Sequence, residues 1–254
     1  MTAAALRALH HDRTPDDPLV LPGPWDAASA RAFVEAGFPA LATPSAGVSD
    51  ALGYADGAAP AAEMFAAVAR IVRAVPASVP VSADVEAGYG LPPEELVERL
   101  LESGAAGCNL EDSVDGVLVE AERQADRLAA VREAAGDALF VNARVDTYVH
   151  GSPGSPGSPG SPGTDPGREA ETVRRALLYV AAGAECVYPI MAPPEALPRL
   201  AAAVPGPLNA LARPDGPAPR RLGGLGATRI TFGPWFQRRA MAAVRGFADE
   251  LRHG

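Results

Sequence analysis

The 254-residue sequence contains no lysine, so all 22 of its basic residues are arginine. Schiff-base catalysis, phosphate binding by a P-loop lysine and general-base catalysis by lysine are therefore excluded. Cysteine is almost as scarce, because Cys108 and Cys186 are the two in the chain and lie far apart in apolar, strand-like segments. This usage argues against a disulfide scaffold or a metal cluster, and we expect both thiols to be buried.

Long apolar runs and basic clusters are also missing. No stretch of about 18 uninterrupted apolar residues appears, and the start MTAAALRALHHDRTPDD lacks the basic beginning and apolar middle of a signal peptide. The net charge is −9 and no basic patch is visible, which argues against nucleic acid and anionic membranes as partners. We therefore expect a cytoplasmic protein that acts on a small molecule.

Short strand-like runs alternate with segments whose apolar residues recur at helical spacing. Such repeats predict parallel strands joined by helices, and eight repeats closing on themselves form a (β/α)₈ TIM barrel. We predict this α/β fold as a single domain over residues 1–254. An open doubly wound sheet is the alternative, although no G-x-G-x-x-G follows the first strand. The expected strands lie within residues 19–23, 39–45, 79–85, 106–112, 138–146, 184–190, 206–212 and 228–233.

One low-complexity tract interrupts the alternation. Residues 151–163 read GSPGSPGSPGSPG, a composition that cannot bury apolar surface. We predict a flexible insertion after the fifth strand. It is not expected to divide the chain into domains, because the strand and helix pattern resumes beyond it.

Polar side chains gather at the ends of the expected strands, where barrel enzymes carry their active sites. Asp84 and Glu86 are two residues apart on an extended chain, so both side chains point to one face. The other polar positions at these ends are Thr43, Ser45 and Gly47 with nearby Asp56, then Asn109, Glu111 and Asp112, then Asn142, Arg144 and Asp146, and finally Asn209.

Four of these acids, Asp56, Asp84, Glu86 and Glu111, would repel one another at one barrel mouth unless a cation held them. Their hard oxygen donors favour Mg²⁺ or Mn²⁺ over zinc. Arg144 offers a rigid, positively charged fork for a substrate carboxylate or phosphonate, with neutralisation of the acids as its structural alternative.

Several polar residues have a structural interpretation that is at least as strong. Asp112 and Asp146 are interpreted mainly as helix caps or arginine partners. His150 borders the flexible tract and is expected to face solvent, and His10 and His11 lie in a polar N-terminal segment without an expected role.

Taken together, the polar motifs resemble the isocitrate lyase and phosphoenolpyruvate mutase superfamily, most strongly its short phosphonomutase-like members. The resemblance covers most of the chain in order. The matching stretches are residues 24–57, VPVSADVEAGYG (79–90), GCNLEDS (107–113), FVNARVD (140–146), PLNALA (207–212) and GATRITFGP (226–234).

The resemblance implies a barrel in which Asp84 holds Mg²⁺ directly and Asp56, Glu86 and Glu111 hold it largely through water. It implies that Ser45, Ala46 and Gly47 cradle the carboxylate end of the substrate with Arg144 opposite, and that Asn209 contacts the substrate. Arg144, Asp56 and Glu111 are the candidate catalytic residues. It also implies homo-oligomers, commonly tetramers, in which paired subunits exchange the C-terminal helix, here residues 234–252.

Two departures from the family pattern bear on activity. Glu86 stands where the family usually has Asp. The lyases carry a Lys-Lys-Cys-Gly-His loop after the fourth strand, whereas this chain reads EDSVDGVLVEAERQ, with no Cys, Lys or His. We therefore do not expect classical isocitrate or methylisocitrate lyase activity.

The activity expected instead is Mg²⁺-dependent cleavage or rearrangement of a C–C or P–C bond in a small 2-oxo acid through an enolate-like intermediate. A non-catalytic protein that binds carboxylate metabolites is the second hypothesis. A purely structural barrel is the third.

Overall fold

The computed structural model describes residues 2–11, 13–150 and 166–253. The tract predicted to be flexible, residues 151–163, lies outside the described residues. None of the described helices is long and apolar enough to cross a membrane.

Within the described residues, eight parallel strands form the centre of the molecule, and each lies inside one of the predicted runs. They are β1 (Leu19–Val20), β2 (Leu41–Ala42), β3 (Val81–Asp84), β4 (Gly107–Glu111), β7 (Phe140–Val145), β8 (Cys186–Pro189), β9 (Asn209–Leu211) and β10 (Arg229–Thr231). The prediction of a parallel α/β fold is therefore confirmed.

The strand order shows that the sheet curls. One group runs β2-β3-β4-β7-β8 and the other β1-β10-β9. A bridge between Val187 and Leu208 connects β8 to the residue before β9, and the Ala42 N–H donates to the Pro22 carbonyl beside β1 at 3.1 Å. The first group follows chain order without the reversal of a doubly wound sheet.

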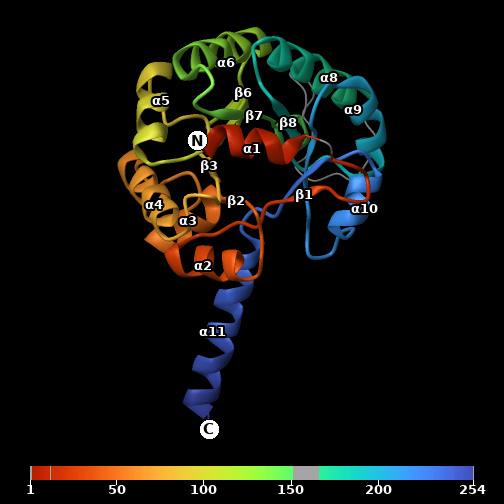
Figure 1. Ribbon diagram of the computed structural model, residues 1–254. Helices are drawn as coiled ribbons and strands as arrows, with labels where there is room; N and C mark the ends of the chain where they lie inside the picture. Colours follow the sequence, from red (N-terminus) through yellow and green to blue (C-terminus); the bar gives the residue numbers. More distant parts are fainter. Residues whose placement is uncertain (1, 12, 151–165, 254) are drawn as a thin grey trace.

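Helices surround the strands on the outside (Figure 1). They are α2 (Ala27–Glu35), α3 (Ser45–Leu52), α4 (Ala61–Arg73), α5 (Pro93–Glu102), α6 (Ala121–Ala135), α7 (Thr147–His150), α8 (Pro166–Ala181), η1 (Pro194–Ala196), α9 (Leu197–Ala203) and α10 (Pro219–Gly224). One more helix, α11 (Trp235–His253), follows β10. Local sequence sets their ends: Asp26 and Ser29 form a capping box at the start of α2, and α5 begins at a proline pair. The carboxyl ends of the strands are thereby held at one side of the molecule.

An N-terminal helix, α1 (Thr2–His10), closes the opposite end of the strands. Its Leu6 is fully buried with Leu19, Ala40 and Phe140, which lie at or just before the beginnings of their strands. His10 stacks on Phe140 with 4.2 Å between ring centres, and burial lowers its pKa to about 3. The N-terminal helix is therefore part of the core, which corrects the interpretation of His10 as a residue without a role.

The C-terminal helix α11 extends away from the rest of the molecule (Figure 1). Within the described part of this helix, Gln237 near its start is buried, whereas Val244, Phe247 and Leu251 are exposed by 53%, 63% and 88%. These side chains leave an apolar surface exposed to solvent on a 19-residue helix.

Candidate active site

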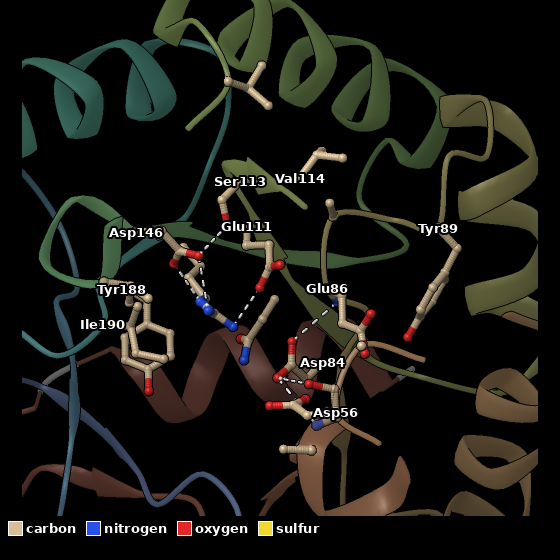
Figure 2. A pocket seen from close by; sticks show the side chains of 18 of the residues that line it. Asp56, Asp84, Glu86, Tyr89, Glu111, Ser113, Val114, Asp146, Tyr188 and Ile190 are labelled. Atoms are coloured by element: carbon tan, nitrogen blue, oxygen red, sulfur yellow. Dashed lines mark hydrogen bonds and ion pairs between the residues drawn. The ribbon is translucent and has the colours of Figure 1, made fainter. Parts of the chain in front are cut away.

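A cavity of about 1200 Å³ opens at the carboxyl ends of the strands. Asp84 ends β3, Glu111 ends β4 and Arg144 lies near the end of β7, and all three line it. Asp56 and Glu86 line it from the loops before α4 and after β3. The structure thus brings together at one cavity the acids and the arginine that the sequence singled out (Figure 2).

Asp84 is fixed by the neighbouring strand β2 and helix α3. Its carboxylate accepts a hydrogen bond from the Ser45 hydroxyl at 3.0 Å, and its backbone N–H donates to the Thr43 hydroxyl at 3.1 Å. Burial raises the pKa of Asp84, and Arg144 and Ser45 oppose this shift. The side chain is therefore an oriented acid in a poorly solvated place.

Arg144 joins two carboxylates. Its Nε and Nη2 donate to Asp146 at 2.7 and 3.0 Å, and its Nη1 lies 2.6 Å from Glu111. Asp146 is fully buried and also accepts a hydrogen bond from the Ser113 hydroxyl at 2.6 Å. Because a guanidinium has five N–H donors, two remain for a ligand. Asp146 therefore orients Arg144, while Glu111 connects it to the other acids.

The acids outnumber the cation that contacts them. Burial raises the pKa of Glu111 to about 8 against the opposing effect of Arg144, with Asp146, Asp84 and Glu86 adding to the increase. Burial, followed by Asp84 and Asp56, raises the pKa of Glu86 to about 7. A divalent cation would supply charge to balance these clustered acids.

The donor set suits Mg²⁺ better than a metal held entirely by protein. No group of three or more His, Cys, Asp or Glu side chains is arranged to hold a metal ion in the described part of the chain. Mg²⁺ commonly keeps several waters and needs one or two carboxylates. A buried oxygen of Glu86, Oε1, has no hydrogen-bond partner among the described residues. It could therefore accept a hydrogen bond from a water bound to the ion. The residues therefore fit an ion bound by Asp84 with the other acids reached through water.

The N-terminus of α3 supplies backbone donors to the same cavity. The helix begins at Ser45, and its first N–H groups have no intrahelical acceptor. Ser45 and Ala46 line the cavity, whereas Gly47 is buried against Pro44, a position in which a side-chain carbon would meet Pro44 at 3.1 Å. Ser45 and Ala46 thus lie at the cavity, where the Ser45 N–H donates to Asp84 at 3.4 Å, and Gly47 permits the close packing behind them. Their contact with a substrate stays a prediction.

A layer of amides lies beneath the cavity. The Asn142 amide donates to Asn109 at 2.7 Å and to Asn209 at 3.1 Å, and Asn209 donates to Thr231 at 2.9 Å. Arg229, fully buried, donates to Asn109 at 3.2 Å. Asn109 and Thr231 line the cavity, but Asn209 is fully buried in the layer below. Its position gives no support to the predicted substrate contact, which stays a prediction.

Two other residues given structural interpretations can be placed. Asp112 is fully buried and accepts from Arg175 at 2.9 Å and Tyr179 at 2.8 Å, as expected of an arginine partner. His150 lines the cavity with its Nε2 3.9 Å from Asp146. His150 therefore lies at the cavity, whereas its side chain was predicted to face solvent.

Three residues that line the cavity were not predicted from the sequence, namely Tyr188, Gln124 and Tyr89. Tyr188 stands beside Arg144 in the register of β7 and β8, so strand alternation could have placed it there. Gln124 on α6 donates to the Glu111 carbonyl at 3.0 Å. Tyr89 follows the Asp84 and Glu86 pair in the loop.

The segment after β4 forms a short hairpin of β5 (Ser113–Val114) and β6 (Val117–Leu118), which was not predicted. Asp115 and Gly116 turn with φ of 50° and 76°, as in a two-residue type I′ turn. Asp-Gly between two valines is a hairpin signal that the sequence carried.

The sequence pattern of the phosphoenolpyruvate phosphomutase family matches residues 6–252. The chain belongs to this family. Among curated proteins, an uncharacterized protein of Mycobacterium tuberculosis is 35% identical over 226 residues, which cover 89% of this chain and 80% of that protein.

Solved structures place the chain within the wider phosphoenolpyruvate mutase and isocitrate lyase superfamily as a phosphonomutase-like member. A protein of Burkholderia cenocepacia J2315, described only provisionally as a phosphonomutase, is 36% identical with a TM-score of 0.86, covering 98% of this chain and 99% of that one. A 2,3-dimethylmalate lyase of the superfamily is 28% identical with a TM-score of 0.81, covering 99% and 87%. Both likenesses extend over nearly the whole of this chain.

Proposed function

We propose that this family member is a Mg²⁺-dependent enzyme that cleaves or rearranges a C–C or P–C bond in a small 2-oxo acid. The observation that carries the proposal is the joint position of Asp84, Glu86 and Glu111 around one cavity with Arg144. The superfamily relative that acts on 2,3-dimethylmalate supports a small carboxylic acid as the substrate class.

The chemistry follows from charge that develops on the substrate. Breaking a bond next to a 2-oxo acid leaves an enolate-like species whose oxygens carry more negative charge than those of the substrate. The two remaining N–H groups of Arg144 and the backbone N–H of Ala46 would stabilise that charge, since preorganised donors act most strongly where charge appears during reaction.

Asp84, with Glu86, Glu111 and Asp56 at longer range, would hold the ion. Mg²⁺, when bound, polarises the substrate oxygens as a Lewis acid. Asp146 keeps Arg144 oriented, and Glu111 links Arg144 to the other acids. These residues account for binding and charge stabilisation, and the group that moves the proton is not assigned.

The curled sheet is proposed to be the closed (β/α)₈ barrel, supported by the two connections between the strand groups. The protein is proposed to assemble as a dimer or tetramer in which α11 packs on a second subunit. The exposed Val244, Phe247 and Leu251 support this role.

A turnover screen tests the proposed activity. Oxaloacetate, phosphonopyruvate and 2-methylisocitrate would be incubated with the protein in Mg²⁺ and in chelator, and Asp84→Asn would serve as the inactive control. Turnover of oxaloacetate or phosphonopyruvate that requires both Mg²⁺ and Asp84 is expected. Absence of turnover on all three acids, or turnover that is independent of the metal, contradicts the proposal.

One observation favours a second candidate, a non-catalytic binder of carboxylate metabolites. The segment from Glu111 to Gln124 carries no Cys, Lys or His to move a proton. Calorimetry with oxalate, an enolate mimic, separates the two when it is combined with the screen. Mg²⁺-dependent oxalate binding without turnover of any acid would favour the binder.

A further inference from the structure

The hydroxyl of Tyr89 is a buried polar group without a hydrogen-bond partner among the described residues. The side chain lines the cavity, and Figure 2 shows the phenol beside Glu86 with its hydroxyl directed towards the side where Glu86 and Asp56 lie. Buried hydroxyls in folded proteins are nearly always hydrogen-bonded, because an unpaired one costs free energy. This position calls for an acceptor that the described chain does not supply.

The loop around Tyr89 holds the phenol in place at a conformational cost. Tyr89 has φ of 55°, in the left-handed region that side chains disfavour. Its ring packs edge to face on Phe65 with 5.9 Å between centres. Arg127 donates to the carbonyls of Ala87 at 3.3 Å and Leu91 at 3.0 Å, one on each side of Tyr89. Strain that the surroundings maintain is typical of residues with a binding or catalytic task.

The phenol can donate a hydrogen bond but does not release its proton. Burial, followed by the charges of Glu86, Asp84 and Glu111, raises the pKa of Tyr89 far above its ordinary value. A neutral donor that lies beside Glu86 and has no hydrogen-bond partner among the described residues is suited to an oxygen that enters the cavity. The occupant with such oxygens in the proposed function is the carboxylic acid substrate.

We propose that the Tyr89 hydroxyl donates a hydrogen bond to an oxygen of the acid bound in this cavity, which makes Tyr89 a substrate-binding residue. The inference rests on the proposed function, because it takes a carboxylate as the occupant. It adds a neutral donor on the side of the cavity near Glu86 and Asp56, in addition to the donors of Arg144 and α3.

Tyr89→Phe tests this inference because it removes the hydroxyl and keeps the ring that packs on Phe65. In calorimetry with oxalate at saturating Mg²⁺, we expect the Kd of the variant to rise by about tenfold. The ligand-free variant should unfold at the same or a higher temperature than the wild type, because an unpaired buried donor is gone. Affinity for Mg²⁺ alone should not change.

Tyr148→Phe is the matched control, since Tyr148 packs with Arg168 near α8 rather than in the cavity lining. It should leave oxalate affinity unchanged. An unchanged oxalate Kd in Tyr89→Phe overturns this inference and leaves the proposed function standing. An equal loss of affinity for Mg²⁺ alone also overturns it, because the hydroxyl would then serve the ion. A wild-type protein that binds no oxalate with Mg²⁺ overturns the proposed function and this inference with it.

Discussion

At the scale of single residues, Arg144 is the group on which the charges of the site depend. It bonds Asp146 through two nitrogens and Glu111 through a third, so its position is fixed before a ligand arrives. A lysine has the same charge but no planar fork, and it cannot reach both acids in this way. The geometry of the guanidinium matters here as much as its charge.

We therefore expect Arg144→Lys to lower kcat/KM for the substrate by roughly a hundredfold, the usual cost of removing one donor to developing charge. Steady-state kinetics at saturating Mg²⁺ measures this. Arg174→Lys, an exposed arginine on α8 that pairs with Glu122, should leave the kinetics unchanged. Activity of Arg144→Lys within threefold of wild type would contradict the role given to the fork.

The raised pKa values of Glu111 and Glu86 predict how the metal-free protein responds to pH. Both pKa values lie above 4.5, at about 8 and about 7, so between roughly pH 4.5 and 8 the folded protein binds more protons than the unfolded chain. Stability should therefore fall as pH rises through this window. Melting temperatures in chelator from pH 5 to 8 check this.

Glu111→Gln should reduce the decrease in melting temperature between pH 5 and 8. Glu98→Gln, on the exposed face of α5, should leave that decrease unchanged. Saturating Mg²⁺ should also reduce the fall, because the ion replaces the protons that the acids lose. A melting temperature that rises across this window would show that other groups control the response.

At the scale of elements, Asp112 connects the end of β4 to α8. Asp112 and Arg175 are both fully buried, and Tyr179 adds a second bond from the same helix. Removing one partner of such a pair leaves an uncompensated buried charge, which is more costly than the pair is stabilising. Asp112→Ala should lower the free energy of unfolding by about 3–5 kcal/mol.

Denaturant titration of Asp112→Ala measures this loss. Glu122→Ala is the matched control, because Glu122 also pairs with α8 through Arg174 but is 65% exposed. Its effect should be much smaller, because an ion pair at the surface is screened by solvent. Similar losses in the two variants would contradict the difference drawn between buried and exposed pairs.

The sequence predicts elements best where burial sets a simple pattern. All eight central strands lie in predicted runs, because each is a short apolar segment between capped helices. Helix α1 was missed since its buried face is small and includes His10, whose burial depends on Phe140 far along the chain. The acids and Arg144 were found because strand ends converge in this fold. Tyr89 was not, since an unpaired hydroxyl is a property of tertiary packing.

At the scale of the whole molecule, the second half of α11 is exposed beyond the body formed by the other described residues. Phe247 and Leu251 are exposed by 63% and 88% on a helix that leaves the body (Figure 1). We expect the wild type to be a dimer or tetramer at micromolar concentration. The double variant Phe247→Asp with Leu251→Asp should be a smaller species with an unchanged circular dichroism spectrum.

Light scattering after size exclusion measures both masses. Glu250→Gln, on the same helix, should keep the wild-type mass. A wild type that is monomeric, or a double variant with the wild-type mass, would contradict the role given to α11.

The amide layer beneath the cavity affects how such a protein can acquire new specificity. Asn142 on β7 and Asn209 on β9 bond each other and side chains on two other strands, β4 and β10, so replacing one amide leaves acceptors and donors on its neighbours without partners. Such a floor tolerates few single substitutions. The β5–β6 hairpin and the loop that carries Tyr89 take no part in these hydrogen bonds. Substitutions that change which acid is bound would therefore accumulate first at the rim of the cavity, while the amide layer stays unchanged.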